Sequence, residues 1–379
     1  MLTQWMQRIV ILLLYFVSCA VFAHENIISL ADIHFSPFMG CENFAKPCPL
    51  VMKLQQTSAA EWGKVLATNN NKDISTAYHE TNYFLLESAL QAAHAAAEKH
   101  PPQFVFILGD SLAHHYRKLY RKFAKDRSSA GYQLFVKNTF QFLASEIQKT
   151  FPETTIYFIN GNNDSYTNNY SVVPEGSFLH DIAAIWAPML HDEASQAEFL
   201  KDFPTAGYYA VTVPGHENQK IIVLNSVLFS SHIKNKLLDK AADQQLIWLT
   251  AELKKAAQAK QHVMIALHIP MGIDLYESFL RGLTGVHYFW RGEYSVEFTR
   301  ILKQFPDVVT AIFPAHIHVE AYRFGTPREI AGAGVYFTPS ISPIYGNRPG
   351  FKVFEYDDKD FQVSGVKTFY YAGQGRWEE

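Results

Sequence analysis

The chain has 379 residues, of which 48% are hydrophobic and 18% charged, and its formal net charge is −3. This composition suits a globular protein with a large core, built as one large domain or two. The sequence has no long basic run, which argues against binding of a nucleic-acid polymer, although a single nucleotide could still be a substrate.

Residues 1–23 have the pattern of a secretory signal peptide. Arg8 is their only charged residue, an apolar run follows it, and small residues stand before the expected cleavage point after Ala23. The apolar run is too short to span a membrane comfortably, and no later segment is long and apolar enough to do so. Lipoprotein processing at Cys19 is the alternative, but the preceding residues match it poorly. We therefore predict export to the periplasm or the medium, with residues 24–379 as a single domain.

Removal of the signal peptide would leave two cysteines, Cys41 and Cys48, in a stretch of loop-like composition. In an oxidising compartment they are expected to form one local disulfide. The alternative is two free thiols in a loop.

Apolar strands alternate with amphipathic helices in the first half of the chain. The predicted strands cover 27–33, 104–108 and a run from 156 to the turn at Gly161, and the predicted helices cover 80–99 and 132–151. Residues 35–72 are rich in Pro, Gly and Asn and are predicted to be an irregular excursion over the mouth of the sheet. The alternation favours a parallel or mixed sheet that is covered by helices.

The second half repeats this pattern. Strands are predicted over 208–213, 221–225, 262–267 and 308–313, with helices over 243–255 and 294–303 and strand-like runs over 335–338, 351–356 and 361–371. No linker divides the chain, so we expect two sheets packed face to face with helices outside.

Polar side chains gather where five of the predicted strands end. These residues are Asp32, His34, Asp110, Asn162, His268, His316 and His318. Each one alone is more often a turn residue or a satisfied core residue, but the ordered set is hard to explain as turn chemistry. Imidazole nitrogens with carboxylate or amide oxygens suit zinc, manganese or iron, and the two oxygens of Asp110 could bridge two ions. The set therefore predicts a metal site.

The order of these motifs resembles the calcineurin-like metallophosphoesterases. The motifs are Asp-x-His at 32–34, Gly-Asp at 109–110, Gly-Asn-x-Asp at 161–164, the isolated His268 and His-x-His at 316–318. The stretches 109–114, 244–249, 267–270, 338–343 and 347–351 are similar to those of the acid sphingomyelinase-like phosphodiesterase branch. The resemblance runs from about residue 26 to residue 370.

The resemblance implies an α/β protein, a four-layer α/β/β/α sandwich with two mixed β-sheets and a dinuclear metal site at the strand C-termini. Carried over by position, Asp32, His34, Asp110 and His318 would hold one ion, and Asp110, Asn162, His268 and His316 the other. Zinc is the implied metal, with manganese and iron as alternatives. The ions would activate water and clamp a phosphoryl group, so the implied activity is hydrolysis of a phosphodiester, either a nucleotide or a phospholipid head group.

The proton donor is the point where the sequence departs from the family. His114 matches the position that contacts the phosphate or protonates the leaving oxygen, and His115 is its substitute if the turn is offset. The alternative is a pair of solvated histidines at the start of a helix. Where the family usually has a catalytic His, this chain has Asn163, whose neutral amide cannot act as an acid.

The segment 276–294 is rich in aromatic residues and falls between two metal-ligand motifs. One interpretation is a substrate-binding wall that includes Tyr288 and Trp290, and the other is ordinary core packing. Two further functions stay open: a phosphomonoesterase or nucleotidase on the same site, and a catalytically weak metal-containing protein that binds a ligand or the surface of a membrane.

Overall fold

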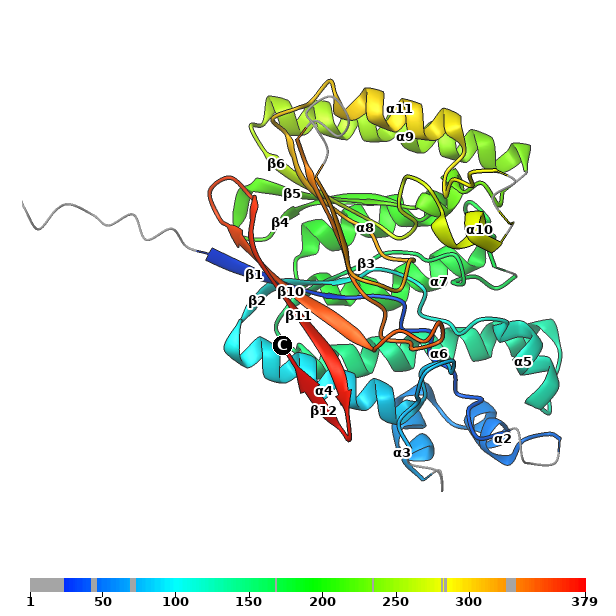
Figure 1. Cartoon of the computed structure of the whole chain (residues 1–379). Helices are drawn as coiled ribbons and strands as arrows, with labels where there is room; N and C mark the ends of the chain where they lie inside the picture. Colours follow the sequence, from blue (N-terminus) through cyan, green and yellow to red (C-terminus); the bar gives the residue numbers. More distant parts are fainter. Residues whose placement is uncertain are drawn as a thin grey trace, which may run out of the picture.

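The computed structural model describes residues 24–41, 46–68, 73–167, 169–233, 235–280, 282, 285–324 and 332–379. The predicted signal peptide in residues 1–23 lies outside the described residues. Two mixed sheets of six strands form the centre of the molecule, and helices cover their outer sides (Figure 1). This arrangement confirms the predicted α/β/β/α sandwich.

The first sheet has the strand order β12-β11-β10-β1-β2-β3. Its strands are β1 (His24–Leu30), β2 (Pro102–Ile107), β3 (Thr155–Phe158), β10 (Gly350–Asp357), β11 (Val363–Gly373) and β12 (Arg376–Glu378). Strands β1, β2 and β3 run parallel to one another, while β10 pairs antiparallel with β1. The three buried apolar strands predicted in the first half of the chain are therefore the parallel half of this sheet.

The second sheet has the order β4-β5-β6-β7-β9-β8. Its strands are β4 (Tyr209–Val213), β5 (His216–Leu224), β6 (His262–Leu267), β7 (Val309–Phe313), β8 (Ala321–Phe324) and β9 (Gly334–Phe337). The inner strands β5, β6, β7 and β9 are parallel, and the edge strands β4 and β8 are antiparallel to their neighbours. Both sheets are thus mixed, as predicted.

Ten α-helices and three short 3₁₀ turns surround the sheets in the described part of the chain. The α-helices are α2 (Pro49–Gln56), α3 (Trp62–Ala67), α4 (Tyr83–Lys99), α5 (Tyr116–Phe123), α6 (Ser129–Thr150), α7 (Ser177–Trp186), α8 (Glu193–Ala206), α9 (Lys236–Gln258), α10 (Leu275–Leu280) and α11 (Gly292–Leu302), and the 3₁₀ turns are η1 (Ala59–Glu61), η2 (Ala187–Leu190) and η3 (Ser226–Phe229). Figure 1 shows α9 and α11 on one outer side and α4 and α6 on the other. No helix in the described residues has the length and apolarity needed to cross a membrane.

The prediction that 35–72 is irregular throughout was wrong. Helices α2 and α3 lie within it, and Pro49 occupies the first turn of α2, where a proline costs no backbone hydrogen bond. Trp62 of α3 is fully buried and contacts Phe135 and Phe142 of α6 at ring-centroid distances of 5.0 and 6.1 Å. Tertiary packing, and not the local pattern, therefore stabilises these short helices.

Aromatic side chains fill the space between the two sheets. Phe313 of β7 contacts Phe106 of β2 and Phe354 of β10, with ring centroids 5.3 and 5.0 Å apart. Tyr336 of β9 adds a contact to Phe354 at 5.8 Å. All four rings are buried, so this apolar layer sets the spacing of the sheets and the relative position of their strand ends.

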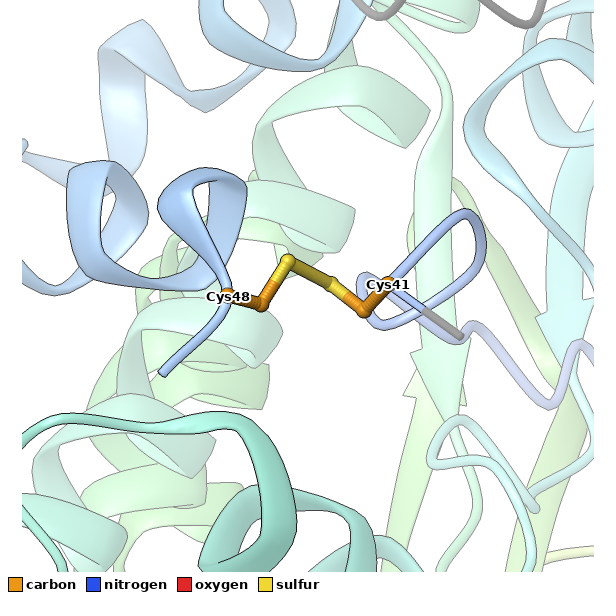
Figure 2. Close-up of a disulfide and its surroundings, with 2 residues drawn as sticks. All are labelled: Cys41 and Cys48. Carbon is orange, nitrogen blue, oxygen red and sulfur yellow. A yellow bond between two sulfur atoms is a disulfide. The ribbon is translucent and has the colours of Figure 1, made fainter. Parts of the chain in front are cut away.

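Cys41 and Cys48 form a disulfide, which confirms the predicted pairing (Figure 2). Their Cα atoms lie 5.7 Å apart, and both residues are buried. Cys48 also precedes α2 directly, and its backbone N–H donates to Phe123 O at the end of α5. The disulfide therefore ties the loop after β1 to the α2–α5 side of the molecule.

Replacement of both cysteines by alanine should lower the free energy of unfolding by about 2 kcal/mol, because the unfolded chain loses the constraint of a short closed loop. Urea unfolding under oxidising conditions measures the difference. With a reductant present, the wild type and the double variant should have nearly equal stability. Equal midpoints for the two proteins under oxidising conditions would show that the disulfide does not stabilise the fold.

Candidate metal centre

The seven predicted metal ligands follow five strands whose carboxyl ends meet at one place between the sheets. Asp32 and His34 come after β1, Asp110 after β2 and Asn162 after β3, all in the first sheet. The remaining three ligands come after β6 and β7 in the second sheet; they are His268, His316 and His318. Ligand sites of open α/β sheets lie at such carboxyl ends, and here both sheets contribute.

Five of these seven residues have left-handed backbone conformations. Their φ angles are positive at Asp32 (47°), His34 (43°), Asp110 (50°), His316 (70°) and His318 (61°). A non-glycine residue in this region costs about 1 kcal/mol or more, and such strain concentrates at functional sites. Neighbouring loops hold the strained residues in place, because Asp32 N donates to Gly109 O and His34 N donates to Asp110 O.

The first donor group contains Asp32, His34 and His318, whose ligand atoms all lie within 4.8 Å of one another. Nε2 of His34 lies 3.2 Å from Nε2 of His318, and the latter lies 3.5 Å from Asp32 Oδ1. Asp110 Oδ2 is 3.5 Å from His34 Nε2. These four residues are the set that the family resemblance assigns to one ion.

The second donor group contains Asp110, His268 and His316, again within 4.8 Å of one another. Nε2 of His268 lies 3.0 Å from Asn162 Oδ1 and 3.4 Å from Asp110 Oδ2. Asp110 Oδ2 is thus within 3.5 Å of a histidine from each group. The carboxylate of Asp110 lies between the two groups, as a bridging ligand would.

The chemistry of the donors fits divalent cations. Asp32 Oδ1 is buried and has no hydrogen-bond partner among the described residues, and an isolated buried carboxylate oxygen is costly unless a cation compensates it. The Nδ1 atoms of His34 and His268 donate to Leu112 O and Leu108 O. These hydrogen bonds fix both rings with Nε2 toward the centre, as carbonyl oxygens commonly do for metal-bound histidines.

Burial lowers the pKa of three histidines well below its usual range, so their rings are neutral, as metal ligands must be. These three are His34, His316 and His318. Burial disfavours a charge on Asp110, but the charge of His268 and a hydrogen bond to it hold the Asp110 pKa well below its usual range. Burial also opposes protonation of His268, but the Asp110 carboxylate raises its pKa to about 9, so a cation that binds His268 Nε2 would have to displace a proton.

Asp164 holds together the two loops that carry Asp110 and Asn162. Its Oδ1 accepts hydrogen bonds from Ser111 N and Leu112 N, and its Oδ2 accepts one from Gly161 N. Both loops approach closely at Gly161, where an added Cβ would collide with the backbone N and Oδ1 of Asp110. A glycine is therefore required at the turn before Asn162.

Asn163 is buried and bonded to the carboxylate of Asp110. Its backbone N–H donates to Asp110 Oδ1 and its side-chain Nδ2 donates to Oδ2, each at 2.7 Å. Asn162 is oriented in a similar way, since its Nδ2 donates to Asn169 Oδ1 and leaves its own Oδ1 toward His268. Asn163 is thus placed to orient the central carboxylate.

His114 lies directly against the first donor group. Its ring stacks on His34 with centroids 4.2 Å apart, and its Nε2 is 3.2 Å from the hydroxyl of Tyr345. Burial works against a charge on His114, but hydrogen bonding to Glu80 and the charge of Glu80 raise its pKa above the usual value. His115 is exposed before α5, and the described residues show no contact between its side chain and the donor groups.

Aromatic rings border the donor groups on the open side. Tyr345 contacts His318 at 4.7 Å and Tyr276 at 5.9 Å between ring centroids, and both tyrosines are more than half exposed. On the other side, Phe289 contacts His316 at 5.6 Å, and the hydroxyl of Tyr170 lies 3.5 Å from His316 Nε2. We call these four residues (Tyr170, Tyr276, Phe289 and Tyr345) the aromatic rim.

The two aromatic residues predicted to bind substrate differ in their positions. Trp290 is 1% exposed, packs against Phe229 and Phe298, and donates its indole N–H to Ile269 O, so no surface of its ring is left for a substrate. The core-packing alternative holds for this residue. Tyr288 is 53% exposed, and its substrate contact stays a prediction.

Sequence reasoning missed Glu80, Tyr170, Asn169 and Tyr345. Glu80 and Tyr170 stand in segments without a motif, and only the folded chain brings them to His114 and His316. Tyr345 lies between the two motif-like stretches 338–343 and 347–351, and this position was the one available signal. Asn169 could not be predicted, because a side chain that orients a metal ligand does not stand at a fixed distance from it in the sequence.

The chain is similar in sequence to several proteins named as phosphodiesterases. Human acid sphingomyelinase-like phosphodiesterase 3b is 24% identical over 375 residues, which cover 92% of this chain and 73% of that protein. Human cyclic GMP-AMP phosphodiesterase is 24% identical over 242 residues, which cover 62% of this chain and 51% of that protein. Sphingomyelinase phosphodiesterase C of Dictyostelium discoideum is 25% identical over 308 residues, with coverages of 77% and 62%.

Among solved structures, a dimetal phosphatase from Danio rerio superimposes with a TM-score of 0.49 at 12% identity, covering 92% of this chain and 99% of that chain. The family model for the calcineurin-like phosphoesterases matches residues 26–320, which include all seven predicted ligands, most of β1 and the strands β2 to β7. The chain therefore belongs to the calcineurin-like phosphoesterase family.

Proposed function

We propose that this chain is an exported phosphodiesterase that works with two divalent metal ions, most favourably zinc, and that residues 24–379 act as one catalytic domain. The observation that carries the proposal is the pair of donor groups joined by Asp110. Relatives named as phosphodiesterases support a diester as the substrate. The disulfide between Cys41 and Cys48 supports export, because disulfides form and persist in oxidising compartments.

Bound ions would activate a water molecule and compensate the negative charge of the phosphoryl oxygens. The residues of the chain supply the rest. Asn163 would hold the carboxylate of Asp110 in a fixed orientation between the two donor groups, because its backbone N–H and its side-chain Nδ2 each donate to one oxygen of Asp110. His114 is the proposed proton donor, since Asn163 cannot release a proton and His115 faces solvent.

The surroundings of the site support a substrate with an apolar or aromatic part. Seven large apolar side chains in the described part of 273–288 are exposed; they are Ile273, Leu275, Tyr276, Phe279, Leu280, Val286 and Tyr288. Exposed apolar patches of this kind usually mark a binding surface. The patch is continuous with the aromatic rim through Tyr276, so a nucleotide base or the apolar part of a phospholipid could lie on it while the phosphate reaches the donor groups.

The protein should bind two divalent ions per chain and hydrolyse bis(4-nitrophenyl) phosphate with a higher kcat/KM than 4-nitrophenyl phosphate. A chelator should abolish the activity, and zinc or manganese should restore it, because the donor groups need cations to hold a phosphoryl group. Metal analysis by mass spectrometry and side-by-side rates test this. Full activity of the metal-free protein would refute the proposal, and a preference for the monoester would favour the nucleotidase alternative.

Loss of Asp110 and loss of Asn162 should have different effects on the metal content. Asp110→Asn should weaken both sites, because Asp110 lies between them, whereas Asn162→Ala should weaken only the site that contains His268. Both changes should reduce activity by about 100-fold or more. Loss of a residue that only supports a metal ligand costs up to about 100-fold, and loss of a ligand itself should cost at least as much. Isothermal titration with zinc measures the two sites.

Asp181→Asn is the matched control for Asp110→Asn. Asp181 accepts hydrogen bonds from Lys137 and Tyr166, and neither residue contacts a donor group in the described structure. This variant should keep both sites and full activity. If Asp110→Asn removed only one of the two binding events, a bridging role of Asp110 would be excluded.

The aromatic rim should affect substrate binding more than turnover. Tyr276→Ala should raise KM for bis(4-nitrophenyl) phosphate by roughly 2- to 10-fold and leave kcat nearly unchanged, as expected for the loss of one ring contact. Tyr288→Ala tests the neighbouring exposed ring in the same way. Ile247→Ala is the control, since Ile247 is 71% exposed on α9 on the outer side of the molecule. A fall in kcat with constant KM would contradict a binding role.

A further inference from the structure

Glu80 is hydrogen-bonded to both the backbone and the side chain of His114. Glu80 Oε1 accepts two hydrogen bonds from this one residue, from its backbone N–H and from ring Nδ1, both at 2.9 Å. Glu80 is 9% exposed, and its second oxygen lies 3.5 Å from Ser342 Oγ. A carboxylate held in this way fixes both the backbone and the side chain of His114.

The contact determines which ring nitrogen of His114 faces the site. Because a carboxylate only accepts hydrogen bonds, Nδ1 must carry a proton, and Nε2 is the atom left for other partners. Nε2 lies toward the hydroxyl of Tyr345 on the aromatic rim, and the ring lies flat on His34. Nε2 of His114 therefore faces the aromatic rim, within hydrogen-bond distance of Tyr345.

Glu80, His114 and His34 also form a third group of ligand atoms within 4.8 Å of one another. A third ion there would need His34, whose Nε2 already faces the first donor group. It would also need Glu80 Oε1, which already accepts two hydrogen bonds from His114. The geometry favours a hydrogen-bonded carboxylate–imidazole pair over a third metal site.

From these contacts we propose that Glu80 is a positioning residue, which holds the ring of His114 with Nδ1–H toward the carboxylate and Nε2 toward the leaving oxygen of a phosphodiester. The inference rests on the proposed function. In the step, the attacking water releases one proton to solvent, and its oxygen forms the new bond to phosphorus while the bond from phosphorus to the leaving oxygen breaks. His114 takes part as an imidazolium with a proton on each nitrogen. The Nε2 proton passes to the leaving oxygen, so the alcohol departs neutral, and solvent then reprotonates Nε2.

A series of aryl methyl phosphates tests the inference, from the 4-nitrophenyl to the phenyl ester. Nitrophenolate leaves as a stable anion and needs little help, whereas phenolate is a poorer leaving group and gains from protonation. Glu80→Ala should therefore lower kcat by about 100-fold for the phenyl ester, within the range of general acid catalysis. It should change kcat little for the 4-nitrophenyl ester and leave KM and metal content unchanged.

Glu80→Gln separates orientation from charge. Its side-chain oxygen can still accept the Nδ1–H bond, so this variant should retain more activity on the phenyl ester than Glu80→Ala. Glu175→Ala is the matched control, because Glu175 pairs with a histidine, His180, on the exposed surface at 3.7 Å. It should behave as the wild type with every ester.

A double-mutant cycle decides whether Glu80 acts through His114. In a His114→Gln background, Glu80→Ala should have little further effect on the phenyl ester, because the residue that it positions is gone. Additive losses would overturn the inference. So would a loss of equal size for all esters, or a lowered metal content, since both indicate a general structural role.

Nuclear magnetic resonance of protein with ¹⁵N-labelled histidine tests the geometry without any activity. The wild type should show a slowly exchanging Nδ1–H proton that disappears in His114→Gln and exchanges rapidly in Glu80→Ala. An unchanged spectrum in Glu80→Ala would overturn the inference. Absence of hydrolysis by the metal-loaded wild type would instead refute the proposed function, and the spectrum would still report on the Glu80–His114 pair.

Discussion

The carboxylate of Asp110 is the contact on which the metal centre depends. It lies within 3.5 Å of His34 and His268, which follow strands of different sheets. It also accepts hydrogen bonds from the backbone N–H and the side-chain Nδ2 of Asn163. A buried charge in this position needs compensation from every side. Three features position this one carboxylate. The strand ends converge on it, Gly161 allows the neighbouring loop to approach it, and hydrogen bonds to Asp164 hold the two loops together.

The apolar layer between the sheets makes this convergence precise. Ligands after β1, β2 and β3 can meet ligands after β6 and β7 only if the sheets keep a fixed spacing, which rings such as Phe106, Phe313 and Phe354 provide. The strained left-handed residues at the strand ends persist because the packed sheets and the loop hydrogen bonds leave no alternative. The packing of the core thus fixes the relative positions of the side chains that would bind the metal ions.

The sequence predicted the buried strands and the polar side chains that gather at their ends, because both follow a local rule: a buried apolar run that ends in a polar turn. It could not predict the helices α2 and α3, whose stability comes from the contact of Trp62 with α6. It also could not separate Trp290, which turns into the core, from Phe289, which reaches His316. Glu80 was invisible for the same reason, since its partner stands 34 residues away.

Asn163 and His114 together show how the acid role could move within one site. Asn163 binds both oxygens of Asp110, one through its backbone N–H and the other through its side-chain Nδ2, and neither contact requires a change of protonation. In the proposed reaction the proton comes from His114, which stacks on His34 and whose Nδ1 is held by Glu80. Under this proposal, orientation of the central carboxylate by Asn163 and delivery of the proton by His114 are carried by separate residues, and each is held by its own hydrogen bonds.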